Sequence, residues 1–232
     1  MTLKMCTLQL RYLKGTVDCH LTLGLHDGNP TELTAYSDSD WGHDIDNHCS
    51  IAGYVFLLGL STISWSSKKH VTVATSSVDS EYQASSMTAC HGLWLCHLLI
   101  ELGLAELETL PTTIFIDNWG AIDFTKDNWH HQQTKHIDII HHFIHECVED
   151  KTFTIIHCPS TKMLADGFTK PLPHEPFNRM VDGLGLISGW GGVLDFIPLP
   201  VHIDWTHHSC FSITHYQHGP PAQPHWWILH MA

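Results

Sequence analysis

Three stretches with the composition of β-strands follow one another closely in the first third of the chain, and their spacing restricts the folds available. The second and third are separated only by Gly59 and Leu60, a link of β-hairpin length. Successive strands joined by short links favour an antiparallel meander. The three stretches are residues 33–39, 50–58 and 61–67.

The remainder of the core sequence alternates between helical and strand-like segments. Its first helix is expected to start at the hydroxyl cluster of residues 75–77, which supplies candidate N-caps, and to end at Gly103. A meander followed by such alternation predicts an α/β fold, in which three antiparallel strands and two parallel strands form a five-stranded mixed sheet flanked by helices. The expected elements are helix 75–102, strand 112–116, helices 119–126 and 134–149, strand 152–157 and helix 161–169.

Acidic residues occur at the ends of several of these elements. Asp38 lies near the end of the first strand of the meander, where a carboxylate is costly unless it is paired or binds a cation. Glu81 is placed on the first long helix, Asp117 at a strand end and Asp166 near a helix start. We expect these four carboxylates to converge without dedicated basic partners, and such a cluster predicts a divalent-cation site.

Charge and cysteine content restrict the function further. The formal net charge is −13, and the only arginines are Arg11 and Arg179. This is a poor composition for a free-standing nucleic-acid binder, because phosphate contacts require Lys and Arg. Metal ions or a larger parent polypeptide would have to supply the missing positive field.

The eight cysteines are scattered without a C-x-x-C pair, and no signal peptide is present, which predicts an intracellular protein that is not secreted. No apolar run reaches the ~20 residues of a membrane span.

Five short motifs follow one another along the chain: Tyr36-Ser-Asp-Ser-Asp-Trp41, Ser76-Ser-Val-Asp-Ser-Glu-Tyr82, Ile116-Asp-Asn118, Lys135-His-Ile-Asp138 and Leu164-Ala-Asp-Gly-Phe-Thr-Lys-Pro-Leu172. In this order they resemble the ribonuclease H domain of Ty1/copia-type retrotransposon Pol polyproteins, the region that follows the reverse transcriptase. The resemblance covers roughly residues 8–187. It predicts a remnant of the reverse transcriptase connection at 1–32, a ribonuclease H-like domain at 33–175, the end of the resemblance at 176–187 and a His-, Trp- and Pro-rich tail without a fold of its own at 188–232.

The resemblance implies a ribonuclease H fold and an endonuclease that hydrolyses the RNA strand of RNA–DNA hybrids with two Mg²⁺ ions, for which Mn²⁺ is a substitute. Asp38, Glu81, Asp117 and Asp166 would be the catalytic metal ligands, with Glu81 preferred over Asp79 because it directly precedes the aromatic-Gln-Ala run. The expected partners are the hybrid and the reverse transcriptase domain of a parent polyprotein. The expected location is a cytoplasmic particle or the nucleus.

Contacts with the RNA 2′-hydroxyl groups are predicted for the side chains of Ser76, Ser77 and Asn118, and His157 is a candidate for the loop histidine that assists turnover in cellular ribonucleases H.

Three alternative interpretations remain at this stage. Six histidines between positions 130 and 145 offer a zinc hypothesis, but Cys147 is the only nearby thiol and a structural site needs four ligands. The second alternative is that the chain is a decayed retroelement fragment without catalytic activity. An integrase- or transposase-like nuclease is disfavoured, because its acidic order would end in Glu, whereas here Glu81 comes second and Asp166 last.

Overall fold

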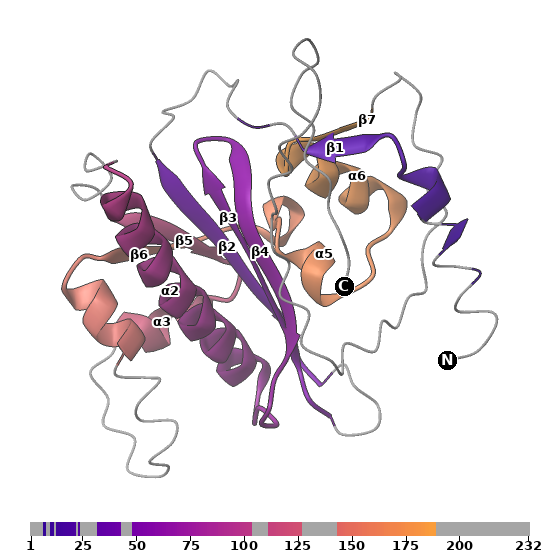
Figure 1. Ribbon diagram of the computed structural model, residues 1–232. Helices are drawn as coiled ribbons and strands as arrows, with labels where there is room; N and C mark the ends of the chain where they lie inside the picture. The colour runs from indigo at the N-terminus through magenta and orange to yellow at the C-terminus, as the bar shows by residue number, and fades with distance from the viewer. Residues whose placement is uncertain are drawn as a thin grey trace.

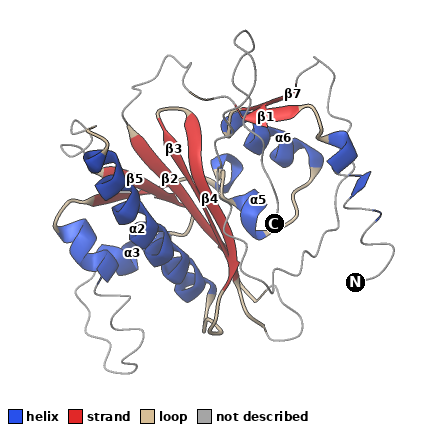
Figure 2. Cartoon of the chain, in the orientation of Figure 1, coloured by secondary structure: helices blue, strands red, loops and turns tan. Residues whose placement is uncertain are grey.

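The computed structural model describes residues 7, 10–11, 13–21, 23, 32–42, 48–103, 111–126 and 143–188. Their main feature is a five-stranded sheet with helices on both sides (Figure 1), accompanied by a separate two-stranded sheet (Figure 2). The strands are β1 (Cys19–Leu21), β2 (Leu33–Asp40), β3 (Ile51–Leu58), β4 (Ser61–Lys69), β5 (Thr112–Ile116), β6 (Phe153–His157) and β7 (Leu186–Ser188). The helices include α2 (Ser77–Glu101), α3 (Trp119–Lys126), the 3-10 helix η2 (Ser160–Lys162), α5 (Asp166–Thr169) and α6 (His174–Gly183). Residues 143–149 are helical as well.

The large sheet has the strand order β4-β3-β2-β5-β6. β2, β3 and β4 pair antiparallel, and β5 and β6 add to β2 in parallel. The turn between β3 and β4 uses Gly59 with φ of 61°, a conformation that glycine adopts without strain. The predicted α/β class and the five-stranded mixed sheet are therefore confirmed.

Side chains alternate across the sheet and build a core on each face. Phe56 of β3 packs with Tyr82 of α2 and with Ile114 of β5 on one face. Its neighbours Val55 and Leu57 point to the other face, where they form a second cluster with α6. Figure 1 shows α2 and α3 on the first side of the sheet and α5 and α6 on the second.

Residues 160–169 differ from the sequence prediction. The prediction of a single helix over 161–169 is wrong, because the chain forms η2, then an extended residue and a turn, then the single-turn helix α5. Met163 is extended, with φ of −72° and ψ of 107°. The chain turns inward there because Met163 and Ala165 are buried against Cys158. Burial of these two side chains outweighs the helical preference of the segment and leaves Asp166 at the start of a new helix.

Helix α6, the strand β7 and the pairing of β7 with β1 have no counterpart in the sequence prediction. α6 packs on β3 through Met180 and Val181. β7 runs antiparallel to β1, with Cys19 opposite Ser188 and Leu21 opposite Leu186. Across the described parts of the chain, every helix is too short or too polar for a membrane span.

Candidate metal centre

Asp38 is the innermost acidic residue of the described chain. Its neighbours on β2, Ser37 and Ser39, hydrogen-bond α2, through Thr88 and Ser80 respectively. Because side chains alternate along a strand, Asp38 points to the opposite face. It is 2% exposed, and Thr169 Oγ1 of α5 donates a hydrogen bond to its Oδ2.

A glycine opposite Asp38 lets α5 approach the sheet. Gly53 of β3 is the antiparallel partner of Asp38. A Cβ atom at Gly53 would lie 2.8 Å from Phe168 Cβ and 2.8 Å from Thr169 Cγ2. Only a residue without a side chain permits this approach, so Gly53 fixes how close Asp166 comes to Asp38.

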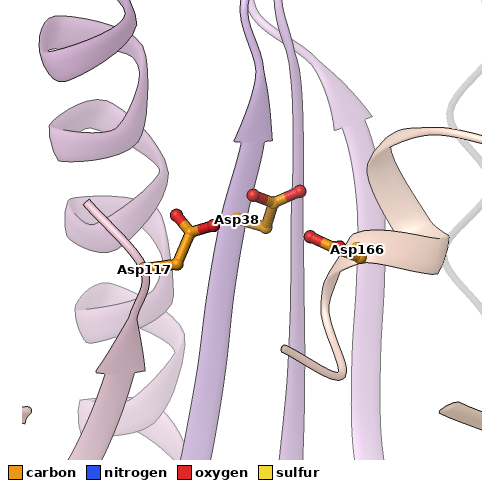
Figure 3. A group of neighbouring side chains, drawn as sticks. All are labelled: Asp38, Asp117 and Asp166. Atoms are coloured by element: carbon orange, nitrogen blue, oxygen red, sulfur yellow. The ribbon is translucent and has the colours of Figure 1, made fainter. Parts of the chain in front are cut away.

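Three aspartates from three separate elements meet at this position (Figure 3). Asp117 directly follows β5, and Asp166 is the first residue of α5. One carboxylate oxygen from each of Asp38, Asp117 and Asp166 lies within 4.8 Å of the other two. The loop after β6 holds Asp117 in place, because Ser160 Oγ donates to Asp117 Oδ2 at 2.8 Å.

Glu81 reaches the same region from α2 and is 5% exposed. Its Oε1 accepts a hydrogen bond from the backbone N of Ser39 at 3.2 Å, whereas its buried Oε2 has no hydrogen-bond partner. Burial, followed by the negative charges of Asp38 and Asp117, raises the pKa of Glu81 to about 10. Asp79 faces away from this centre and accepts hydrogen bonds from Thr75 and Gln83.

Asp166 is also perturbed, and it has a basic neighbour that was not predicted. Burial and the charge of Asp38 raise its pKa to about 6, against the opposing effect of Lys170. Lys170 Nζ lies 2.9 Å from Asp166 Oδ1 and 3.6 Å from Asp38 Oδ2. The expectation that the carboxylates lack basic partners is therefore wrong. The sequence signal is the i,i+4 spacing of Asp166 and Lys170.

The predicted substrate residues have structural roles at the helix starts. Ser76 Oγ accepts from the backbone N of Asp79 at 3.1 Å and so caps α2. Asn118 Oδ1 accepts from the backbone N of Ala121 at 3.2 Å, in the first turn of α3. Ser77 is the first residue of α2. The predicted contacts of these residues with RNA stay predictions.

Aromatic rings and a cavity border the centre on two sides. His157 stacks on the exposed Trp119 with ring centroids 4.1 Å apart, and its Nε2 lies 3.1 Å from the backbone O of Asp117. A cavity of about 340 Å³ adjoins Asp166 on the side of α6, and both Lys162 and Arg179 line it. The ring pair thus lies next to Asp117, and the cavity lies next to Asp166.

The zinc hypothesis falls mostly on residues 127–142, which lie outside the described residues. Of its histidines, His145 lies within the described part, and its Nδ1 is 3.1 Å from the backbone O of Thr125.

The chemistry of the donor set fits a hard divalent cation. All ligand atoms are carboxylate oxygens, which Mg²⁺ prefers. Burial, followed by nearby like charges, raises the pKa values of Glu81 and Asp166, and the buried Glu81 Oε2 has no hydrogen-bond partner. A bound cation would offset the like charges and give this oxygen a partner. Among the described residues, Asp38, Asp117 and Asp166 form the one group of three such ligands. Fold and site together define an α/β domain with a group of three aspartates that offers oxygen ligands to a metal ion.

Comparison with known proteins identifies relatives of this chain. No protein-family model matches the chain. It is 39% identical over 188 residues to the retrovirus-related Pol polyprotein from transposon RE2 of Arabidopsis thaliana, covering 80% of this chain and 13% of that protein. It is 36% identical over 179 residues to the corresponding polyprotein from transposon TNT 1-94 of Nicotiana tabacum, covering 77% of this chain and 13% of that protein. The chain is thus homologous to a segment of transposon Pol polyproteins, and it spans about an eighth of the length of these relatives.

Solved structures with a similar arrangement include ribonucleases H. LC11-RNase H1, isolated from compost, is 15% identical, with a TM-score of 0.42, 60% of this chain covered and 93% of that chain covered. Prototype foamy virus protease-reverse transcriptase is 13% identical, with a TM-score of 0.37, and the match covers 70% of this chain and 21% of that chain.

Proposed function

We propose that this chain is a ribonuclease H that hydrolyses the RNA strand of RNA–DNA hybrids during retrotransposon reverse transcription. The observation that carries the proposal is the convergence of Asp38, Asp117 and Asp166 from three elements, with the buried Glu81 beside them. The relation to Pol polyproteins supports the biological setting.

Asp38, Asp117 and Asp166 would hold the metal, and Glu81 would join them once it loses its proton. Two Mg²⁺ ions, when bound, supply an activated water and stabilise the leaving oxygen. The chain itself orients the ligands: Thr169 fixes Asp38, Ser160 fixes Asp117 and the backbone of Ser39 fixes Glu81. Mn²⁺ has the same preference for oxygen ligands and would substitute.

RNA is distinguished from DNA by its 2′-hydroxyl groups, which a wide minor groove displays. Ser76, Ser77 and Asn118 lie at the starts of α2 and α3, and we assign the contacts with these hydroxyl groups to their side chains. Lys162 and Arg179 of the neighbouring cavity supply the nearby positive charge for the hybrid backbone.

The net charge of −13 limits affinity for a polyanion. The reverse transcriptase domain of a parent polyprotein would supply the missing basic surface. We therefore expect the chain alone to bind a hybrid weakly, with a dissociation constant that rises steeply with salt. Nanomolar binding that persists at high salt would contradict this expectation.

The test is Mg²⁺-dependent cleavage of a labelled RNA–DNA hybrid at low salt by the wild type and by Asp38→Asn. We expect the RNA strand alone to be cut, with a loss of about 10³-fold or more in the variant, or ~4 kcal/mol of transition-state stabilisation. Asp123→Asn is the matched control, because Asp123 is exposed on α3 and should keep wild-type cleavage.

Cleavage of the DNA strand, or no cleavage by wild-type protein with an intact fold by circular dichroism, would contradict the proposal. The second outcome would favour the decayed-fragment hypothesis.

A further inference from the structure

Lys170 places an ammonium group among the carboxylates of the metal centre. The residue directly follows α5, and its backbone N donates to the backbone O of Asp166 at 3.0 Å. Its Nζ lies 2.9 Å from Asp166 Oδ1 and 3.6 Å from Asp38 Oδ2. One ammonium thus contacts two of the three aspartates that form the ligand group.

The surroundings of this ammonium are unusual for a surface ion pair. Asp38 is 2% exposed, so its charge is almost removed from water and needs a nearby cation. The lysine side chain is itself 37% exposed. Because it is flexible and partly in contact with solvent, it can leave the carboxylates without unfolding any helix.

An ammonium and a divalent cation would need the same oxygens. Two cations within a few ångströms repel strongly where little water screens them. Asp38 and Asp166 therefore cannot keep Lys170 at its present distance and also bind a divalent ion between them.

We propose that Lys170 is an internal counter-cation, which neutralises Asp38 and Asp166 and is displaced when a divalent ion binds. The inference rests on the metal site of the proposed function, but not on cleavage of a hybrid. Lys170 is thereby a positioning residue: it holds α5 against β2 without metal and lowers the apparent metal affinity, because each binding event must break its two contacts.

The first test is a calorimetric titration of Mg²⁺ and Mn²⁺ into the full chain without nucleic acid. Lys170→Met should bind metal at least about tenfold more tightly than the wild type, because the competing charge is gone. In EDTA the same variant should melt about 4 °C lower, because two buried carboxylates lose their counter-cation, and Mg²⁺ should remove this difference.

Two further variants separate charge from the bulk of the side chain. Lys170→Arg keeps the charge and should keep weak metal binding. Lys151→Met is the matched control, because Lys151 is exposed in the turn before β6, whereas Asp117 of the metal centre lies beyond the other end of that strand. Its metal affinity should equal that of the wild type.

A second measurement needs no variant and remains informative if Lys170→Met fails to fold. Acetylation of the wild-type protein, followed residue by residue by mass spectrometry, should be several-fold faster at Lys170 with Mg²⁺ than with EDTA. The rate at the exposed Lys151 should not change.

Two results would overturn the inference while leaving the nuclease proposal intact. One is metal binding by Lys170→Met that is equal to or weaker than that of the wild type. The other is a rate of Lys170 acetylation that is the same with Mg²⁺ as with EDTA. Conversely, tighter metal binding by the variant together with an inactive wild type would support the counter-cation and contradict the nuclease.

Discussion

Two helices bring carboxylates to Asp38, and they are held in different ways. α2 has 25 residues and packs against β2, β3 and β5 through the main core. α5 has four residues and depends on its close contact at Gly53 and on the bonds from Thr169 and Lys170. Glu81 on the long helix keeps an unpartnered oxygen, whereas Asp166 on the short helix has an ammonium beside it. The large core around α2 tolerates a carboxyl oxygen without a partner, while the single turn of α5 depends on partners of its own.

The largest expected difference between the two helices is in the response to one added methyl group, placed near α5 in one variant and on α2 in another. Gly53→Ala should push α5 away from Asp38 and reduce cleavage about 100-fold, because a displacement of ~1 Å in a catalytic group has an effect of this size. Metal affinity should fall with it. The measurement is hybrid cleavage together with calorimetric titration of Mg²⁺.

Gly92→Ala is the control on α2. A Cβ there would lie 2.9 Å from Phe153 Cε1, a clash similar to that at Gly53. We expect it to lower the free energy of unfolding by about 1–3 kcal/mol. Cleavage by the folded protein should stay within about threefold of the wild type, because distant sites act independently. Equal loss of cleavage in both variants would show that α5 is not specially dependent on Gly53.

A smaller effect concerns the hydroxyl groups between β2 and α2. Thr88 Oγ1 contacts Ser37 Oγ at 3.0 Å and Ala84 O at 2.8 Å. Thr88→Val keeps the shape but leaves the buried Ser37 hydroxyl without this partner, so the free energy of unfolding should fall by about 2 kcal/mol. Urea denaturation measures this change. Thr125→Val, which removes a hydroxyl bonded only within α3, should cost less. If the two variants were equally unstable, the pairing across β2 and α2 would have no special role.

The smallest effect has the opposite sign and concerns Glu81. Its pKa is near 4.5 as an ordinary glutamate and about 10 in the fold, so folding takes up a proton between these pH values. The folded protein in EDTA therefore loses stability as pH rises from about 4.5 to about 10. Glu81→Gln lacks this proton uptake and should be about 1 kcal/mol more stable than the wild type at pH 8.

Thermal unfolding in EDTA at pH 5 and pH 8 checks this prediction. The stability that Glu81→Gln gains over the wild type should be larger at pH 8 than at pH 5. Glu101→Gln, at the exposed end of the same helix, should show no such dependence. A gain that is equal at both pH values would contradict the burial of a protonated Glu81.

Local patterns were sufficient to predict much of the fold. The bounds of β5 and α3 agree with the prediction, because each is a short run with clear ends: Pro111 precedes β5, and Asn118 caps α3. The meander followed from the short links between its strands. These features depend on residues that are close in the sequence, and periodicity and turn residues are therefore enough to predict them.

Features that depend on distant contacts escaped prediction. β7 has three residues and exists as a strand because it pairs with β1, which lies far from it in the sequence. The break at Met163 arises from burial against Cys158, which helical propensity does not register. The contact of Lys170 with Asp38 depends on the approach of α5 to the sheet, which Gly53 permits.

The convergence of Asp38, Asp117 and Asp166 had a different source. The positions of four acidic residues on expected strands and helices or at their ends predicted a convergence, and the family resemblance implies the same four residues as metal ligands. The structure brings three of these side chains together as one group of possible ligands. The cleavage assay with Asp38→Asn tests the catalytic role proposed for Asp38.

The pairing of β1 with β7 has a consequence for modularity. Cys19 lies opposite Ser188, so the chain enters and leaves the described fold at neighbouring points. Units with adjacent entry and exit points tolerate insertion into, and excision from, longer chains. A linker between these two points would yield circular permutants with new ends at the Gly59 turn. Such permutants would show whether the domain still folds when its connections to the rest of the chain are changed.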